Sequence, residues 1–248
     1  MRPFADHRRI ESRDPECKTL SVIEQRSWQR RVVARDRHAL DVLAPIVRQP
    51  DRLFEIEGEH LLHMAAVQQI ARLEADGQAL VLKRYVATTQ ARRLRRAMTA
   101  SRAARSWYAA HRLIEIGVGT PRPWLMLEQR FGPLRGRAWL VTDFCPGIHV
   151  DQAYRLGGRS ERDAIETALA RLFERMLSHR ISHRDTKPAN LLWTRDGQLQ
   201  VIDLDSVRYH WTRAGAVRGS LRDRRIFIDH WRDEPALQQQ FAHRLAIA

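Results

Sequence analysis

The chain has 248 residues, 44% of them hydrophobic, which is enough to bury a core as one large domain or as two small lobes. Two distant cysteines without metal-ligand spacing argue against a disulfide framework, and no apolar run is long enough to span a bilayer. The 43 Lys and Arg against 29 Asp and Glu give a formal net charge of +14, which favours an anionic partner such as nucleic acid, an anionic membrane surface or a phosphorylated substrate.

Residues 1–50 are predicted to form a basic, partly helical N-terminal extension. No secretory signal opens this segment, so we expect a cytoplasmic protein. From Trp28 onward apolar residues recur at helical spacing, with arginines elsewhere on the wheel, which predicts an amphipathic basic helix. Such a helix either docks on an anionic membrane surface or packs on the domain. The residues in this pattern are Val32, Ala39, Leu43 and Ile46, with Arg30, Arg31 and Arg37.

Residues 51–145 are predicted to form a small β-rich lobe. The segments "IARLE" and "ALVLKRY" flank an Asp76-Gly77 turn signal, which predicts a hairpin. The second arm carries Lys83 inside an apolar strand. This lysine is either an edge residue reaching solvent or a partner for an anionic group.

A long basic helix is predicted over roughly Gln90 to Ile116, ended by the glycines and prolines of "GVGTPRPW". Residues 137–144, "RAWLVTDF", form another predicted strand, and "CPGIHV" breaks it. We place a lobe boundary there, so that residues 146–248 form a shortened helical second lobe.

The second lobe is predicted to begin with a helix and to continue into a hairpin. Ser160 and Asp163 form a start resembling a capping box for a helix with an apolar stripe. After the loop "HRDTKPAN", the segments "NLLW" and "LQVIDLD" flank an Asp196-Gly197 turn signal, which predicts the second hairpin.

A strand lysine, the loop "HRDTKPAN" and an aspartate closing the strand "VID" follow one another in the order of the protein-kinase signature. Asp185 and Asn190 are five residues apart, as in that signature. Asn190 and Asp203 are thirteen residues apart, enough for a strand, a tight turn and a returning strand, so both can reach the same metal ion.

Phosphoryl transfer from ATP requires charge neutralisation on the triphosphate and an oriented hydroxyl nucleophile. We therefore predict that Lys83 binds the α- and β-phosphates and that Asn190 and Asp203 hold Mg²⁺. Asp185 is the predicted acceptor of the hydroxyl proton, and Lys187 is predicted to lie near the γ-phosphate. Asp143, at the end of the strand before the lobe boundary, is a further predicted cofactor-binding residue.

The segments "VLKRY", "SWYAAHRLIEIGVGTPRP", "WLVTDF", "ISHRDTKPANLLW" and "VIDLDSVR" together resemble the lipopolysaccharide kinase family, over about residues 53–210. The resemblance implies an α+β, bilobal protein-kinase-like fold with ATP and Mg²⁺ as cosubstrates. It also implies phosphorylation of a heptose or Kdo hydroxyl of the lipopolysaccharide inner core. The site of action would be the cytoplasmic face of the bacterial inner membrane, where a basic protein meets an anionic surface and a polyanionic glycolipid.

The sequence departs from this family's pattern in three places. No Glu or Asp occurs between Gln90 and Leu113, and Ser106 stands before Trp107 where the family tends to have a glutamate. No G-x-G-x-x-G precedes the lysine, and "DLD" replaces D-F-G, so that Asp205 stands where glycine is usual. The activation region after "DLD" is short and contains no A-P-E segment, which mildly favours a sugar acceptor over a protein substrate.

The sequence leaves three alternatives to a lipopolysaccharide kinase open. A pseudokinase or assembly factor would bind its glycolipid or a partner without transfer, a reading that Ser106 and the missing glycine loop favour. A protein Ser/Thr kinase would transfer phosphate to protein substrates. A nucleic-acid-binding module would need aromatic residues interleaved with basic ones, whereas the tryptophans lie in apolar segments.

Overall fold

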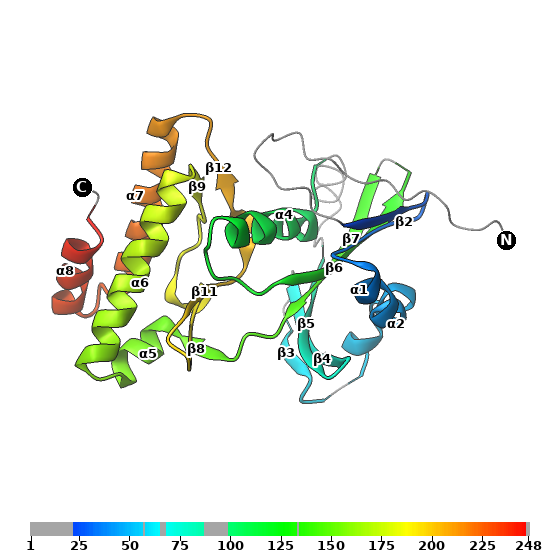
Figure 1. The fold of residues 1–248 in the computed structure, drawn as a ribbon, viewed down its shortest axis with the longest axis horizontal. Coiled ribbons are helices and arrows are strands. Elements are labelled where there is room, and N and C mark those ends of the chain that lie inside the picture. The colour runs from blue at the N-terminus through cyan, green and yellow to red at the C-terminus, as the bar shows by residue number, and fades with distance from the viewer. Residues whose placement is uncertain (1–21, 57, 65–67, 87–98, 133, 247–248) are drawn as a thin grey trace. The chain divides into compact units, whose positions relative to one another are not determined.

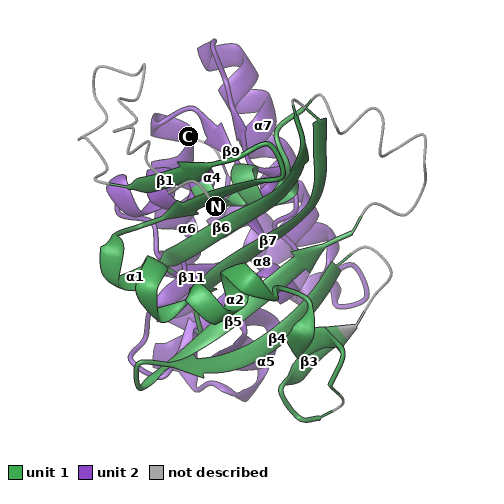
Figure 2. Ribbon diagram, turned by 90° about the vertical axis from the view of Figure 1, so that its right-hand side faces the viewer, with its two compact units in different colours: residues 1–107, 122–144 green, residues 108–121, 145–248 purple. Residues whose placement is uncertain are grey.

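The structure is a computed structural model that describes residues 22–56, 58–64, 68–86, 99–132 and 134–246. The predictions on Cys17 and on the start of the long helix, residues 90–98, lie outside these residues. The chain forms two compact units, unit 1 (residues 1–107 and 122–144) and unit 2 (residues 108–121 and 145–248) (Figure 2). No helix in the described part of the chain is both long and apolar enough to cross a membrane.

Within its described residues, unit 1 is built on a seven-stranded sheet in which every neighbouring pair of strands is antiparallel (Figure 1). The strands in order across the sheet are β1 (Ile23–Arg26), β2 (Arg30–Ala34), β6 (Pro123–Phe131), β7 (Leu134–Asp143), β5 (Gln78–Tyr85), β4 (Gln68–Ala75) and β3 (Leu61–Met64).

The hairpin predicted around Asp76-Gly77 is confirmed as β4 and β5. Asp76 and Gly77 have φ angles of 53° and 67°, the left-handed backbone that a tight two-residue hairpin turn requires. Lys83 lies opposite Ile70 of β4 and Leu140 of β7, so it occupies an interior strand. The alternative that Lys83 is an edge residue is therefore wrong.

The amphipathic helix predicted from Trp28 is wrong over its first part, because Arg30–Ala34 forms β2 between β1 and β6. Val32 and Ala34 pack in one core cluster and Val33 in another, so both faces of the strand are buried. A strand buried on both faces reads as a continuous apolar run, which periodicity does not separate from a helix.

The segment after β2 contains short helices and belongs to unit 1. Asp36 caps the first of them by accepting a hydrogen bond from the Ala39 amide at 2.7 Å. The segment consists of the helices α1 (Arg37–Val42) and α2 (Ala44–Arg48) and the 3-10 helix η1 (Arg52–Phe54).

Helix α4 spans Arg102–Glu115, shorter than the helix predicted from Gln90. Ser101 lies at its N-terminus, with its hydroxyl accepting a hydrogen bond from the Ala104 amide at 3.0 Å, so residues 99–101 are not helical. Gly117 ends the helix with a φ of 71°, where the Val118 amide donates to the Leu113 carbonyl at 2.8 Å. The predicted C-terminal end is therefore confirmed.

The described part of unit 2 contains helices and short strands (Figure 1). Its helices after the boundary are α5 (Val150–Leu156), α6 (Arg159–Ser178), α7 (Arg213–Asp229) and α8 (Pro235–Arg244), with 3-10 helices η2 (Pro188–Asn190) and η3 (Leu204–Ser206). Its strands are β8 (Gly147–His149), β9 (Ile181–Ser182), β10 (Leu191–Thr194), β11 (Leu199–Val201) and β12 (Arg208–Tyr209).

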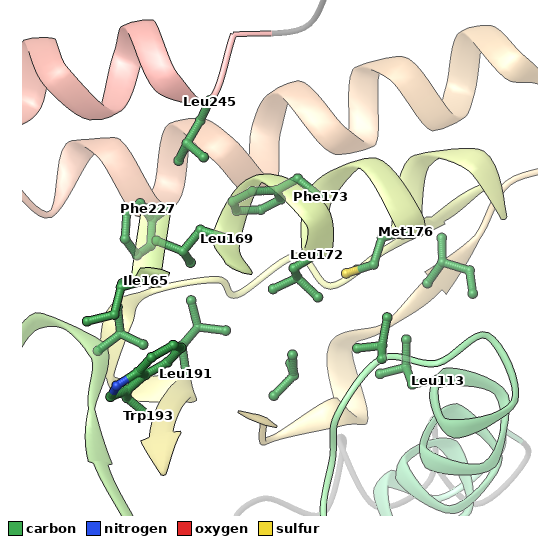
Figure 3. Packing of buried hydrophobic residues seen from close by; sticks show 14 of the residues in the cluster. Leu113, Ile165, Leu169, Leu172, Phe173, Met176, Leu191, Trp193, Phe227 and Leu245 are labelled. Carbon is green, nitrogen blue, oxygen red and sulfur yellow. The ribbon is translucent and has the colours of Figure 1, made fainter. Parts of the chain in front are cut away.

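The core of unit 2 surrounds α6, whose apolar stripe packs toward β10 and α7 (Figure 3). The predicted stripe is confirmed, since all four of its residues are buried there: Ile165, Leu169, Leu172 and Met176. The predicted start of this helix at Ser160 is wrong, since Gly158 is its N-cap and no side chain caps it. Glu161, three residues after this N-cap, does not cap the helix. Its carboxylate accepts a hydrogen bond from the Trp193 indole at 3.0 Å.

The predicted α+β class is confirmed by the mixture of helices with an antiparallel sheet. The second predicted hairpin is also confirmed, because β10 pairs with β11 and Gly197 has a φ of 72° in the turn. These two hairpins carry Lys83 in unit 1 and precede Asp203 in unit 2. The bilobal kinase-like arrangement remains a prediction.

Candidate active site

The loop His183–Lys187 follows the short strand β9, which pairs with β12 through Arg208 opposite Ser182. The loop is not regular structure, and Arg184 has a φ of 71°. A left-handed backbone costs a non-glycine residue about 1–2 kcal/mol. Such a conformation persists when the surroundings fix it.

The buried Asp223 of α7 supplies that fixation. Its two carboxylate oxygens accept hydrogen bonds from the amides of His183 at 2.6 Å and Arg184 at 2.7 Å, and its carbonyl accepts one from the Thr186 hydroxyl at 2.5 Å. Asp223 is 1% exposed. Asp223 thus holds the loop at three positions, two through its side chain and one through its carbonyl.

Burial raises the pKa of Asp223 to about 6, and the two backbone amides lower it again only in part. The desolvation of this carboxylate therefore costs stability at neutral pH, although its hydrogen bonds are all made within the protein. Sequence reasoning missed this residue. The signal that could have identified it is a lone acid among arginines and apolar residues in "SLRDRRIFI".

Asp185 lies in this loop with its side chain 36% exposed. The Asn190 Nδ2 donates to Asp185 Oδ2 at 2.8 Å and to the Asp185 carbonyl at 2.8 Å, while Lys187 Nζ is 3.4 Å from Oδ2. The structure therefore brings together three of the predicted residues. A carboxylate that is partly exposed and held by two neighbours can face a substrate hydroxyl.

Asn190 and Asp203 are joined through Ile202. The Ile202 amide donates to the Asn190 carbonyl at 2.9 Å, and the Ile202 carbonyl accepts from His183 Nε2 at 3.1 Å. The residue preceding Asp203 is thus tied to both His183 and Asn190, which flank Asp185. Asp203 itself adopts a left-handed backbone with φ 61° and ψ 57°.

The donor atoms of this pair suit a hard divalent cation. Because the Asn190 NH₂ donates to two oxygens of Asp185, its Oδ1 is the atom left for a ligand. An amide oxygen and a carboxylate are the ligands that Mg²⁺ takes, usually with water and substrate phosphates completing the shell. No cluster of three or more His, Cys, Asp and Glu that could hold a metal ion occurs among the residues that the structure describes.

His183 is fully buried, and burial lowers its pKa. Its ring is neutral at pH 7, with the proton on Nε2 because the Ile202 carbonyl can only accept. This histidine supports the loop and has no access to substrate. The absence of metal-ligand spacing in the sequence agrees with that role.

The remaining predicted residues, Lys83 and Asp143, belong to unit 1. Along β5, Leu80 and Leu82 pack in one cluster and Tyr85 in another, so Lys83 shares the face of Tyr85. The N-terminal turns of α4 pack on that same face through Ala103, Ala104 and Trp107.

Ser106 is also on this helix, 3% exposed, with its hydroxyl 3.3 Å from the Tyr85 hydroxyl. The position where the resemblance implies a glutamate therefore holds a neutral hydroxyl beside the neutral hydroxyl of Tyr85. Asp143 accepts a hydrogen bond from the Trp124 indole at 2.5 Å, which fixes its carboxylate at the end of β7.

A cavity of about 630 Å³ lies within unit 2, between α6, the Gly117–Gly119 turn and the β10–β11 hairpin. Arg171 and Arg175 of α6 line one side of it. None of the predicted site residues lines this cavity.

A family model for the lipopolysaccharide kinase (Kdo/WaaP) family matches residues 55–223, more than half of the chain. The match includes Lys83, the loop His183–Lys187, Asp203 and Asp223. No curated protein matches the chain.

Proposed function

Because the chain belongs to the lipopolysaccharide kinase (Kdo/WaaP) family, whose members are kinases, we propose that it transfers the γ-phosphoryl group of ATP to a sugar hydroxyl, heptose or Kdo, of the lipopolysaccharide inner core. Transfer of this kind depends on positioning and on electrostatic stabilisation more than on covalent chemistry. The residues that the chain supplies fit those two tasks.

In unit 2, Asp185 orients the acceptor hydroxyl and accepts its proton as the new P–O bond forms and the bond from the γ-phosphorus to the bridging oxygen breaks, which releases ADP. Lys187, whose Nζ lies 3.4 Å from Asp185 Oδ2, stabilises the negative charge that develops on the transferred phosphoryl group. Asn190 Oδ1 and the Asp203 carboxylate would hold Mg²⁺, which neutralises charge on the triphosphate when it is bound.

In unit 1, Lys83 binds the α- and β-phosphates, and Asp143 contributes to nucleotide binding. A lysine on an interior strand is held by backbone hydrogen bonds to both neighbours, so its Cα is fixed without an ion pair to a helix glutamate. The missing glutamate therefore does not by itself exclude phosphate binding.

One observation carries the proposal: the Asn190 amide donates to the carboxylate and carbonyl of Asp185 and leaves its oxygen for a metal. A pseudokinase or assembly factor that only binds a glycolipid has no chemical need for a base and metal ligands in this arrangement. The buried Ser106 favours the pseudokinase alternative, since the position before Trp107 holds a neutral side chain and not a glutamate.

The test is transfer of label from γ-labelled ATP, with Mg²⁺, to purified inner-core lipopolysaccharide lacking core phosphate. We expect wild-type protein to label the glycolipid and Asp185→Asn to lose at least about a hundredfold in kcat while it still binds ATP. Asp203→Asn should instead abolish the Mg²⁺ dependence of ATP binding.

The two variants separate the alternatives. Nucleotide binding without transfer by the wild type would support the pseudokinase, and equal transfer by wild type and Asp185→Asn would contradict the assigned base. Label on generic protein substrates, with none on the glycolipid, would indicate a protein kinase.

We also infer that the protein acts at the cytoplasmic face of the inner membrane as a peripheral protein. The net charge of +14 favours an anionic lipid surface, and nucleic acid is not expected as a partner. Co-sedimentation with vesicles containing phosphatidylglycerol, but not with neutral vesicles, is the expected result.

A further inference from the structure

Next to the candidate catalytic loop, unit 2 gathers several arginines that the proposed mechanism does not use. Arg184 precedes Asp185 in the loop, Arg208 lies on β12, and Arg218 and Arg222 lie one turn apart on α7. We call Arg184, Arg208, Arg218 and Arg222 the arginine cluster.

The backbone brings these residues together. Arg208 lies opposite Ser182 in the β9–β12 ladder, one residue before the loop. Helix α7 packs against the same ladder at Gly219, where an added Cβ would lie 2.9 Å from the Ser182 side chain and 2.7 Å from His210 Nε2. Asp223 then ties α7 to the Arg184 amide at 2.7 Å. Strand, loop and helix are therefore fixed relative to one another.

The electrostatics agree with this proximity. Burial and the positive charges of Arg208 and Arg222 lower the pKa of Arg184. Burial and the charges of Arg208, Arg184 and Arg218 likewise lower the pKa of His210, whose Nε2 is 2.8 Å from the Ser182 hydroxyl. Like charges are thus concentrated around a neutral imidazole.

Little in the described part of unit 2 neutralises this cluster. No ion pair within 4.0 Å joins any of its arginines to a carboxylate of a described residue. Asp223, whose charge acts on Arg184, directs both carboxylate oxygens to backbone amides. Arg208, Arg218 and Arg222 are exposed and Arg184 is partly exposed, so an anion can reach them.

We propose that the arginine cluster binds an anionic group, phosphate or carboxylate, that the acceptor carries beside the hydroxyl to be phosphorylated. Guanidinium groups suit this role because their fork of N–H donors matches the oxygens of both anions. Arg184 directly precedes Asp185, so an anion bound there lies on the order of 10 Å from the proposed base. This inference rests on the proposed function and names the part of the acceptor that the site selects.

A membrane phospholipid could offer the same phosphate chemistry. The cluster favours the acceptor because one of its members is part of the catalytic loop and is held there by Asp223. A contact with a membrane surface needs only exposed cations, without a fixed position relative to the reacting hydroxyl.

The experiment compares the acceptor glycolipid with the same glycolipid after removal of its phosphates or amidation of its carboxylates, in non-ionic detergent micelles without phospholipid. The variant is Arg218→Gln combined with Arg222→Gln, and the matched control is Arg225→Gln, an exposed arginine of α7 whose charge does not act on Arg184 or His210. Circular dichroism checks that all three proteins are folded.

For wild type and control we expect a KM for the intact acceptor about tenfold lower than for the acceptor without the relevant anion, as one charge-assisted contact provides. The double variant should lose this discrimination, with a KM for ATP within about twofold of wild type. Discrimination that survives in the double variant would overturn the proposal.

Two further arms separate the remaining outcomes. If wild type transfers no phosphate, the proposed function fails, and equilibrium binding of the same glycolipids tests the cluster alone: anion discrimination lost in the double variant supports it, and its persistence refutes it. Binding to phosphatidylglycerol vesicles lost in the double variant, with unchanged acceptor discrimination, would assign the cluster to the membrane surface and overturn the acceptor role.

Discussion

Lys83 in unit 1 and the Asp185 loop in unit 2 are held in place by different means. Lys83 lies on an interior strand that is paired on both sides, so the sheet ladder fixes its backbone. The loop has left-handed backbone at Arg184, and a single carboxylate 39 residues away binds its amides. A position fixed by many equivalent hydrogen bonds tolerates a local change, whereas one fixed by a single buried side chain does not.

The largest effect is expected at that side chain. Asp223→Ala removes both acceptors and leaves the amides of His183 and Arg184 without partners, which costs about 1–3 kcal/mol for each buried group. A loop displaced by about 1 Å also costs about a hundredfold in transfer. Urea denaturation and transfer assays measure the two quantities.

Asp229→Ala is the control, because Asp229 is an exposed acid at the end of the same helix. Its change in unfolding free energy should stay within about 0.5 kcal/mol. Near-wild-type transfer by Asp223→Ala would show that the loop keeps its shape without this anchor.

The titration of Asp223 should make the stability of the protein depend on pH, which is a second test of how strongly the loop relies on this one carboxylate. Burial raises the pKa of Asp223 to about 6 from 3.8, so the folded protein holds the proton more tightly than the unfolded chain. The stabilisation from protonation is complete below pH 3.8 and is lost as the pH rises through 6. The two pKa values differ by about two, which corresponds to about 3 kcal/mol.

The measurement is the difference in unfolding free energy between wild type and Asp223→Asn from pH 4.5 to pH 7.5, since asparagine does not titrate. We expect wild type to lose stability relative to the variant as the pH rises. A constant difference, or one that changes in the opposite direction, would mean that the amides outweigh burial at this carboxylate.

The smallest effect is expected in unit 1. Ser106→Ala removes a buried hydroxyl that lies 3.3 Å from the Tyr85 hydroxyl, a neutral contact worth about 1 kcal/mol. We expect thermal denaturation to show a slight destabilisation and the KM for ATP to stay within about twofold. A marked rise in that KM would indicate that Ser106 supports Lys83 and that unit 1 depends on a side-chain anchor as unit 2 does.

Sequence reasoning succeeded where the signal is local. The Asp76-Gly77 and Asp196-Gly197 turns, the end of α4 at Gly117 and the spacing of Asp185 from Asn190 all depend on residues a few positions apart. It failed at β2, where burial on both faces removed the alternation typical of a strand, and at the start of α6, where Gly158 took the N-cap position from Ser160.

The sequence by itself determined the loop residues, the two hairpins that carry Lys83 and precede Asp203, and the family, because each depends on short spacings and residue types. Tertiary structure alone decided that Asp223 anchors the loop and that Arg184, Arg208, Arg218 and Arg222 gather beside it. Both depend on the packing of α7 against β9 and β12, in which residues up to 40 positions apart meet. A remote contact of that kind leaves no periodic pattern in the chain.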